Sequence, residues 1–89
     1  MDIFATRLKE LRVERGLTQK KLAKAIDTTD DSIFSWEKGR SQPSLEMLRS
    51  LCICLDISAD YLLGLEDESG GKYNNSFNNF TNSGSINIR

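Results

Sequence analysis

The feature that most constrains this chain is a pair of short helical segments within positions 17–40, separated by only two residues, Asp27 and Thr28. Each segment has its own start signal. Thr18 precedes the first and Thr29 precedes the second, and a threonine hydroxyl at that position accepts a hydrogen bond from a backbone N–H of the opening helical turn. The pattern therefore predicts a helix-turn-helix unit, in which a tight turn joins two short helices.

Apolar spacing supports both helices of this unit. Leu17 and Leu22 stand on either side of the first helix start, in the arrangement called a hydrophobic staple. In the second helix, Ile33 and Trp36 are three residues apart and are therefore expected to face inward together. Gly39 follows them, and glycine is well suited to end a helix because it adopts the left-handed conformation without a steric penalty.

Helices of this length cannot bury enough apolar surface to fold alone, so flanking segments must complete a core. Upstream, apolar residues recur at helical spacing before Gly16, at Phe4, Leu8 and Leu11. Downstream, a periodic stretch opens at Pro43-Ser44. It is expected to place four leucines on one side, namely Leu45, Leu48, Leu51 and Leu55.

A last short helix is predicted between its cap, Ser58, and its stop, Gly64, with Ile57 packed against Leu62. The chain is thus expected to form one all-α domain of five helices within residues 1–65. Only about a dozen large apolar side chains remain for the centre of such a domain, so its stability should be modest.

Taken in order, these segments resemble the helix-turn-helix DNA-binding domains of the phage-repressor-like Cro and C1 type, the XRE family. The resemblance runs from Phe4 to Gly64. It rests on an ordered set of residues: Leu17-Thr18-Gln19, Leu22-Ala23, Ile33, Trp36-Glu37-Lys38-Gly39, Pro43-Ser44-Leu45 and Ser58-Ala59-Asp60-Tyr61-Leu62-Leu63-Gly64. It implies a lambda-repressor-like bundle whose third helix, Thr29 to Lys38, enters the major groove of double-stranded DNA. It also implies a pseudo-palindromic operator bound by a homodimer.

The resemblance further implies roles for individual side chains. The positions that meet base edges in the family are occupied here by Asp30, Asp31, Ser32, Phe34 and Ser35. The positions that lie along the DNA backbone are occupied by Thr18, Gln19, Lys20, Lys38, Arg40 and Gln42. Gln19 is also expected to brace the third helix. Arg12 and Glu37 match a pair that forms an internal salt bridge in relatives, and removing one partner of a buried pair costs about 3–5 kcal/mol.

The chain departs from the family pattern at two kinds of position. Asp27 and Asp56 stand where many relatives have glycine, and aspartate tolerates the left-handed conformation at some strain. Asp30 and Asp31 stand where relatives usually have Gln, Arg, Ser or Asn. Three interpretations of this acidic pair remain open. Both carboxylates stabilise the positive end of the helix, or one accepts a hydrogen bond from a cytosine amino group, or both repel phosphates and weaken DNA binding.

Phe34 also has two interpretations. An exposed aromatic ring on the third helix packs on thymine methyl groups, or the ring is ordinary partial core packing, since single exposed apolar residues are normal. Trp36 is expected in the core, because it shares the inner face with Ile33.

The overall charge gives DNA binding no support by itself, because 12 Lys and Arg face 13 Asp and Glu, for a net charge of −1. The local distribution of charge sets the field at a surface. Basic residues lie in or beside the helix-turn-helix unit, at Lys20, Lys21, Lys24, Lys38 and Arg40, whereas Glu66-Asp67-Glu68 form an acidic cluster beyond it. With few phosphate contacts, non-specific affinity should be weak and specific binding should depend on dimerisation.

The composition argues against several other classes of protein. Histidine is absent, and Cys52 and Cys54 are two residues apart, so on a helix they point apart and leave too few ligands for a closed zinc site. They are expected to be reduced thiols, and no metal or cofactor is expected. No nucleophile–base set or phosphate-binding glycine loop suggests an enzyme. The lack of a membrane-length apolar run or a signal-peptide pattern favours a cytoplasmic location.

The composition changes at residues 66–89, which are rich in Asn, Ser and Gly. This composition favours a disordered tail. However, Ile86 and Ile88 alternate with polar residues, and Asn82-Ser83-Gly84 suits a turn, which indicates a β-hairpin. Because a lone hairpin is marginal in water, an ordered tail would serve as a short oligomerisation element.

The sequence therefore favours a sequence-specific DNA-binding transcriptional regulator, in particular a dimeric repressor of a phage or mobile element. The alternative is an antitoxin-like or other protein-interaction module that keeps the fold and uses its acidic helix against a protein. A third hypothesis is a structural oligomer nucleated by the tail.

Overall fold

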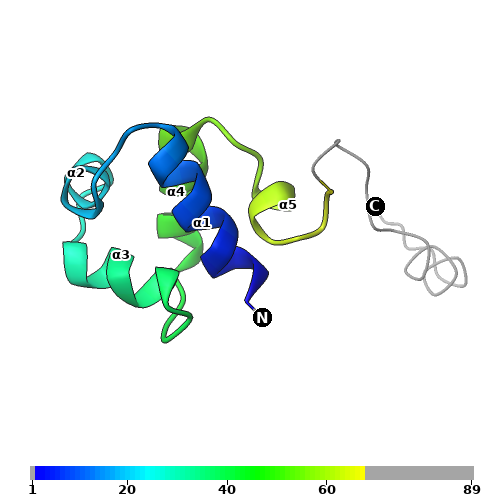
Figure 1. Cartoon of the computed structure of the whole chain (residues 1–89), viewed down its shortest axis with the longest axis horizontal. Coiled ribbons are helices and arrows are strands. Elements are labelled where there is room, and N and C mark those ends of the chain that lie inside the picture. The colour runs from blue at the N-terminus through cyan, green and yellow to red at the C-terminus, as the bar shows by residue number, and fades with distance from the viewer. Residues whose placement is uncertain (1, 68–89) are drawn as a thin grey trace, which may run out of the picture.

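The computed structural model describes residues 2–67, and within them the chain forms five α-helices (Figure 1). These are α1 (Ile3–Glu14), α2 (Gln19–Ala25), α3 (Asp30–Glu37), α4 (Leu45–Leu55) and α5 (Ala59–Leu62). Their number and order confirm the expected all-α bundle. None of these five helices has the length and apolar character needed to cross a membrane. The β-hairpin suggested by the turn at Asn82-Ser83-Gly84 lies outside the described residues.

Each of these helices begins where a side chain accepts a hydrogen bond from the backbone of its first turn. Thr18 Oγ1 accepts from the N–H of Lys21 at 3.0 Å, and Thr29 Oγ1 accepts from the N–H of Ser32 at 3.1 Å. The other three caps are Asp2, Ser44 and Ser58. A cap satisfies an N–H group that the helix itself leaves unpaired, and contributes about 1 kcal/mol. The predicted helix starts at Thr18, Thr29 and Ser58 are confirmed.

Two turns hold an aspartate in the left-handed region of backbone space. Asp27, after α2, has a φ of 62°, and Asp56, after α4, has a φ of 54°. The N–H of Thr28 then donates to the carbonyl of Ala23 at 2.8 Å, which closes the end of α2. The two turns therefore form without glycine, at a strain that a glycine would not have.

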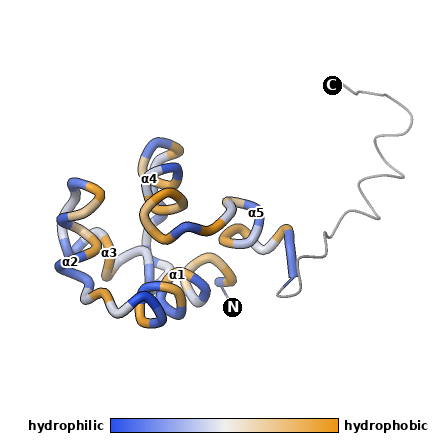
Figure 2. The backbone as a smooth tube through the Cα atoms, turned by 90° about the horizontal axis from the view of Figure 1, so that it is seen from above, coloured by the Kyte–Doolittle hydropathy of each residue, from blue (hydrophilic) through white to orange (hydrophobic). Residues whose placement is uncertain are grey.

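The core lies where the helices meet around α1. In both views α2 and α3 lie to one side of α1, and α5 lies to the other side (Figures 1 and 2). Figure 2 also shows that polar and apolar segments alternate along the helices. Every helix contributes to one apolar cluster, which consists of Phe4, Leu8, Leu11, Leu22, Ala23, Ile26, Ile33, Trp36, Leu51, Leu55 and Leu62. Ile33 and Trp36 therefore face inward, as their spacing predicts.

The prediction for Leu45 is wrong. Leu51 and Leu55 are fully buried and Leu48 is partly buried, but Leu45 is 85% exposed. One residue of an α-helix advances about 100° around its axis, so Leu45 points about a quarter-turn away from Leu51 and Leu55. It also stands in the first turn of α4, where no other helix covers it.

Arg7 of α1 and Arg15, which caps the end of α1, join this helix to the later helices through backbone carbonyls. Arg15 Nε donates to the carbonyl of Leu55, at the end of α4, at 3.0 Å. Arg7 Nη1 donates to the carbonyls of Tyr61 at 2.6 Å and Glu66 at 2.8 Å, and its guanidinium carbon lies 4.0 Å from the centre of the Tyr61 ring. These contacts hold α5 and the segment that follows it against α1.

Candidate nucleic-acid interface

Helix α3 lies at the edge of the molecule (Figure 1), and it has one buried side and one exposed side. Its inner face is formed by Ile33, which is fully buried, and Trp36, which is 6% exposed. Because 3.6 residues make a turn, burying these two positions leaves the intervening positions of the helix on its outer face. The helix can therefore present polar side chains outward without loosening the core.

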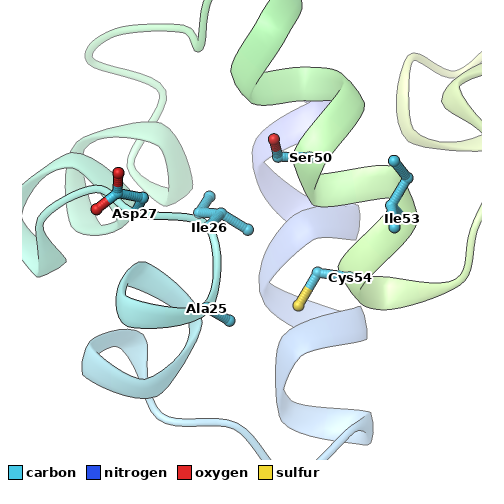
Figure 3. A pocket seen from close by; sticks show the side chains of 6 residues that line it. All are labelled: Ala25, Ile26, Asp27, Ser50, Ile53 and Cys54. Atoms are coloured by element: carbon cyan, nitrogen blue, oxygen red, sulfur yellow. The ribbon is translucent and has the colours of Figure 1, made fainter.

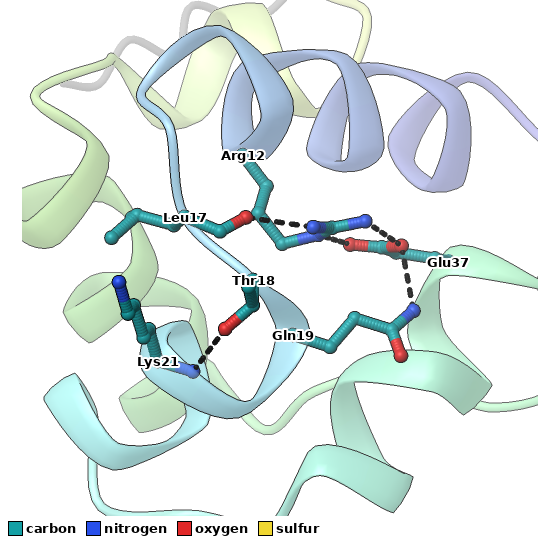
Figure 4. Close-up of polar contacts among 6 residues, drawn as sticks. All are labelled: Arg12, Leu17, Thr18, Gln19, Lys21 and Glu37. Atoms are coloured by element: carbon teal, nitrogen blue, oxygen red, sulfur yellow. Dashed lines mark hydrogen bonds and ion pairs between the residues drawn. The ribbon is translucent and has the colours of Figure 1, made fainter.

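A network of partly buried polar groups sets the direction of α3 (Figure 4). Arg12 of α1 forms a two-pronged ion pair with Glu37, the last residue of α3, with Nε–Oε2 at 2.6 Å and Nη2–Oε1 at 3.2 Å. The two side chains are only 11% and 3% exposed. Arg12 Nη1 also donates to the carbonyl of Leu17 at 2.7 Å, just before α2. The expected Arg12–Glu37 pair is therefore formed.

Gln19 adds α2 to this network. Its Nε2 donates to Glu37 Oε1 at 3.1 Å, so the first residue of α2 contacts the last residue of α3 (Figure 4). A carboxylate that accepts from both a guanidinium and an amide is well compensated for its burial, because charged hydrogen bonds are the strong ones. The network thus fixes α1, α2 and α3 relative to one another, which agrees with the bracing role expected of Gln19.

The predicted base-contact residues are the positions of residues 30–35 that are not buried, and they spread over about 200° of the helix surface. Asp30, Asp31 and Phe34 are exposed, and Ser32 and Ser35 are partly exposed. Within residues 2–67, neither Asp30 nor Asp31 forms an ion pair. Ser32 is engaged locally, because its hydroxyl lies 3.0 Å from Thr29 Oγ1. The first turn of α3 therefore presents two unpaired carboxylates at the positive end of the helix dipole.

The predicted backbone-contact residues lie at two ends of the helix-turn-helix unit. Thr18, Gln19 and Lys20 are at the start of α2, and all but the half-buried Gln19 are exposed. Lys38 and Arg40 follow α3 and are exposed. Gln42, also exposed, lies further along and lines an apolar groove. Cations therefore gather near the end of α3, whereas carboxylates occupy its start.

The side chains of Phe34, Lys38 and Arg40 form a cluster that the sequence alone does not reveal. The Lys38 ammonium and the Arg40 guanidinium each lie 5.5 Å from the centre of the Phe34 ring. Cations within about 6 Å of an aromatic face are attracted by its quadrupole. The spacing of four residues between Phe34 and Lys38 is a usable signal, because such residues are neighbours on a helix surface. Arg40 comes from beyond the helix and gives no such signal.

An open hollow of about 420 Å³ lies between the turn after α2 and the outer side of α4 (Figure 3). Ala25, Ile26 and Asp27 line one side, and Ser50, Ile53 and Cys54 line the other.

Both Cys52 and Cys54 are free thiols. Burial raises the pKa of the Cys52 thiol, which disfavours the reactive thiolate.

A second hollow is an apolar groove of about 230 Å³ beside the start of α4. It is lined by Phe4, Gln42, Pro43, Leu45, Leu48 and Leu63. Leu45 and Leu63 are 85% and 47% exposed, so the groove has large apolar side chains at its rim. Exposed apolar surface of this kind is commonly covered in an assembly.

Comparison with known proteins agrees with this geometry. Residues 8–62 match the helix-turn-helix family model HTH_3. The transcriptional regulator DdrOP3 of Deinococcus deserti is 42% identical over 69 residues, which cover 73% of this chain and 54% of that protein. In three relatives, of which DdrOP3 is the last, the matched segment covers 62%, 31% and 54% of the length of the protein. The similarity therefore extends over part of those proteins.

Two solved structures with bound DNA have the same fold. The P22 c2 repressor in complex with a synthetic operator has a TM-score of 0.68 at 28% identity, covering 71% of this chain and 96% of that one. SinR, a master regulator for biofilm formation, was solved in complex with DNA. Its TM-score is 0.64 at 28% identity, covering 67% of this chain and 97% of that one.

Proposed function

This chain belongs to the helix-turn-helix family of Cro/C1-type DNA-binding domains, and on that premise we propose that it is a sequence-specific transcriptional regulator. The observation that carries the proposal is the exposed outer face of α3, held in direction by the Arg12–Glu37–Gln19 network. A rigid scaffold that projects one helix is what major-groove recognition needs, because base edges are read by side chains placed to within a fraction of an ångström.

We assign the two kinds of DNA contact to different parts of this surface. Base contacts come from the exposed side of α3, the part of the helix that carries Asp30, Asp31, Ser32, Phe34 and Ser35, and a subset of these side chains touches the bases. Phosphate contacts come from the start of α2, through Thr18, Gln19 and Lys20, and from the end of α3 and beyond, through Lys38, Arg40 and Gln42. The segregation of charge along α3 supports this division, because phosphates are attracted to cations and not to the carboxylates of the first turn.

We further propose that the chain acts as a homodimeric repressor, bound to a pseudo-palindromic operator of a phage or mobile element. A dimer places two recognition helices about 34 Å apart, one helical turn of DNA. The groove beside α4 supports this assembly, because its own residue Leu45 is 85% exposed at the rim. In a two-fold contact, Leu45 of each copy would enter the groove of the other copy.

Selection of bound sites from a random duplex pool tests the proposal directly. The expected result is an enriched pseudo-palindrome, and fluorescence anisotropy should then give saturable binding to that duplex and much weaker binding to a scrambled duplex of equal length. Sedimentation velocity, with and without the selected duplex, tests the dimer. A Leu45→Glu variant should dissociate the dimer while Val13→Glu, on an exposed part of α1, should not. Failure to enrich any sequence would reject the proposal.

A second candidate function is a protein-interaction module of antitoxin type. It is favoured by Asp30 and Asp31, which are exposed and form no ion pair within residues 2–67. In that case α3 would bind a basic protein surface. Asp30→Asn together with Asp31→Asn would then abolish capture of that protein, and the pool selection would return no enriched duplex.

A further inference from the structure

The ring of Phe34, a residue of α3, lies close to the turn that follows this helix. It is 38% exposed, so its face is accessible on the outer side of α3. The ammonium of Lys38 and the guanidinium of Arg40 each lie 5.5 Å from its centre, and both side chains are exposed. Two cations therefore share one aromatic ring at the surface proposed to contact DNA.

The backbone brings these three side chains together. The N–H of Lys38 donates to the carbonyl of Phe34 at 3.0 Å, and the N–H of Arg40 donates to the carbonyl of Ser35 at 2.9 Å. Between them, Gly39 has a φ of 73°, which reverses the chain and returns Arg40 toward α3. The position of Arg40 over the ring thus follows from the way α3 ends.

We propose that Phe34 is a positioning residue, which holds Lys38 and Arg40 as a preorganised pair of phosphate-binding cations at the end of α3. This inference rests on the proposed DNA-binding function and names how its phosphate contacts are made. Long cationic side chains lose rotamer freedom when they bind, so a ring that restricts them beforehand lowers that cost. The ring quadrupole also offsets part of the repulsion between two neighbouring positive charges.

The acidic start of α3 explains why the cations at its C-terminal end matter for DNA binding. Asp30 and Asp31 are acidic, so the first turn, which often approaches phosphates through its N–H groups, carries negative charge here. Attraction of α3 to the DNA backbone must therefore come from the opposite end. Lys38 and Arg40 are exposed cations that follow that end in the chain, and both of them lie over the Phe34 ring.

The positioning role and a direct contact of Phe34 with thymine methyl groups have different consequences. A thymine contact would affect only duplexes that carry thymine at one position. A role in holding two phosphate-binding cations would affect every duplex, because all sequences share the same backbone. It would also disappear when the two cations are removed.

The test compares Phe34→Leu, which removes the ring, with Phe34→Tyr, which keeps it, on the selected operator and on an unrelated duplex. Phe34→Leu should weaken binding to both duplexes by about 3- to 10-fold, as expected for two surface cation–ring contacts. Phe34→Tyr should stay close to the wild-type chain. In a Lys38→Gln/Arg40→Gln background, Phe34→Leu should change affinity by less than about twofold. Val13→Ala serves as the control for an exposed apolar side chain.

A measurement without DNA completes the test. Ring currents of Phe34 should shift the side-chain protons of Lys38 and Arg40 upfield in the NMR spectrum of the wild-type chain, and the shift should vanish in Phe34→Leu. An affinity loss confined to the operator, or one that persists in the double-cation background, would overturn the positioning role. Normal DNA binding by a chain whose Lys38 and Arg40 side-chain protons are not shifted would also overturn the positioning role. A wild-type chain that binds no duplex would instead reject the proposed function itself.

Discussion

Arg12 and Glu37 form a two-pronged ion pair that joins the last turn of α1 to the last residue of α3, with the shorter contact at 2.6 Å. Because these side chains are 11% and 3% exposed, the pair is shielded from water on both sides. The contact links residues 25 positions apart in the chain. It therefore connects the fold to the direction of the surface that we propose to meet DNA.

Removal of one partner of this pair should strongly destabilise the fold. Arg12→Met leaves the Glu37 carboxylate buried without its cation, and we expect a loss of about 3–5 kcal/mol in the free energy of unfolding, measured by urea denaturation. Arg12→Met/Glu37→Leu should recover much of that loss, because no charge is left unpaired. Glu14→Gln removes the exposed Arg15–Glu14 pair and should cost less than about 1 kcal/mol. Equal losses in all three variants would contradict the assigned role.

Relief of the left-handed strain at Asp56 should stabilise the chain. Its φ of 54° is a conformation that glycine adopts freely, so Asp56→Gly should gain about 0.5–1 kcal/mol even after the larger entropy of the unfolded chain is counted. In thermal denaturation this corresponds to a rise in Tm of about 2–8 °C for a domain of this size. Asp56→Ala is the matched control and should be less stable than Asp56→Gly. A higher Tm for the alanine variant would show that the turn is not strained.

The acidic pair at the start of α3 should act mainly on the helix. Asp30→Asn and Asp31→Asn should each lower the free energy of unfolding by about 0.3–1 kcal/mol, because the carboxylates face the positive end of the helix dipole. The preferred operator sequence should stay the same when the pool selection is repeated with each variant. Loss of a preference for cytosine at one position would instead indicate a base contact. A uniform rise in affinity for all duplexes would indicate phosphate repulsion.

Substitution of Arg40 should weaken DNA binding without changing its sequence preference. Arg40→Ala should lower affinity for operator and unrelated duplex alike and reduce the slope of log affinity against log salt by about 1. Gln19→Ala should lower operator affinity as well, since it removes both a proposed phosphate contact and the amide that braces Glu37. Lys24→Ala, an exposed lysine of α2 outside the proposed contacts, provides the control. If Arg40→Ala and Lys24→Ala behaved alike, the placement of the backbone contacts would be wrong.

The two cysteines should differ in reactivity. Cys54 is exposed, whereas burial raises the pKa of the partly buried Cys52 thiol, so less of it is thiolate at a given pH. Iodoacetamide near pH 8 should therefore label Cys54 first, and labelling of Cys52 should increase only at higher pH, as mass spectrometry would show. In urea the two rates should converge. For the same reason the stability contributed by a neutral Cys52 is retained below its ordinary pKa of 9.0 and is lost as pH rises through the raised value.

The features that the sequence predicts well are those encoded by neighbouring residues. Thr18, Thr29 and Ser58 cap helices through hydrogen bonds that span three residues, so their effect needs no knowledge of the rest of the fold. The Arg12–Glu37 pair could be anticipated only from the resemblance to relatives, because nothing in the local pattern brings α1 to the end of α3. Helical periodicity also places Phe34 and Ser35 outward, because they lie between the two inward positions Ile33 and Trp36.

The features that the sequence does not predict depend on contacts between distant segments. Leu45 points about a quarter-turn away from Leu51 and Leu55, and no other helix covers the first turn of α4, so Leu45 is exposed. The contact of Arg40 with Phe34 depends on the chain reversal at Gly39, which periodicity does not describe. At Asp27 and Asp56 the turns form although the sequence lacks the glycine that a pattern search would require, because aspartate tolerates the left-handed conformation.

The contacts of Arg7 with Tyr61 and with the carbonyl of Glu66 have a consequence for a protein fused after residue 67. They anchor the exit of the chain to the first helix, across that helix from α2 and α3 (Figure 1). A fluorescent reporter fused beyond residue 67 would therefore depart from a tethered point remote from the recognition helix. Such a fusion would leave the side of α3 that we propose to contact DNA unobstructed, and it offers a way to follow the proposed DNA binding in living cells.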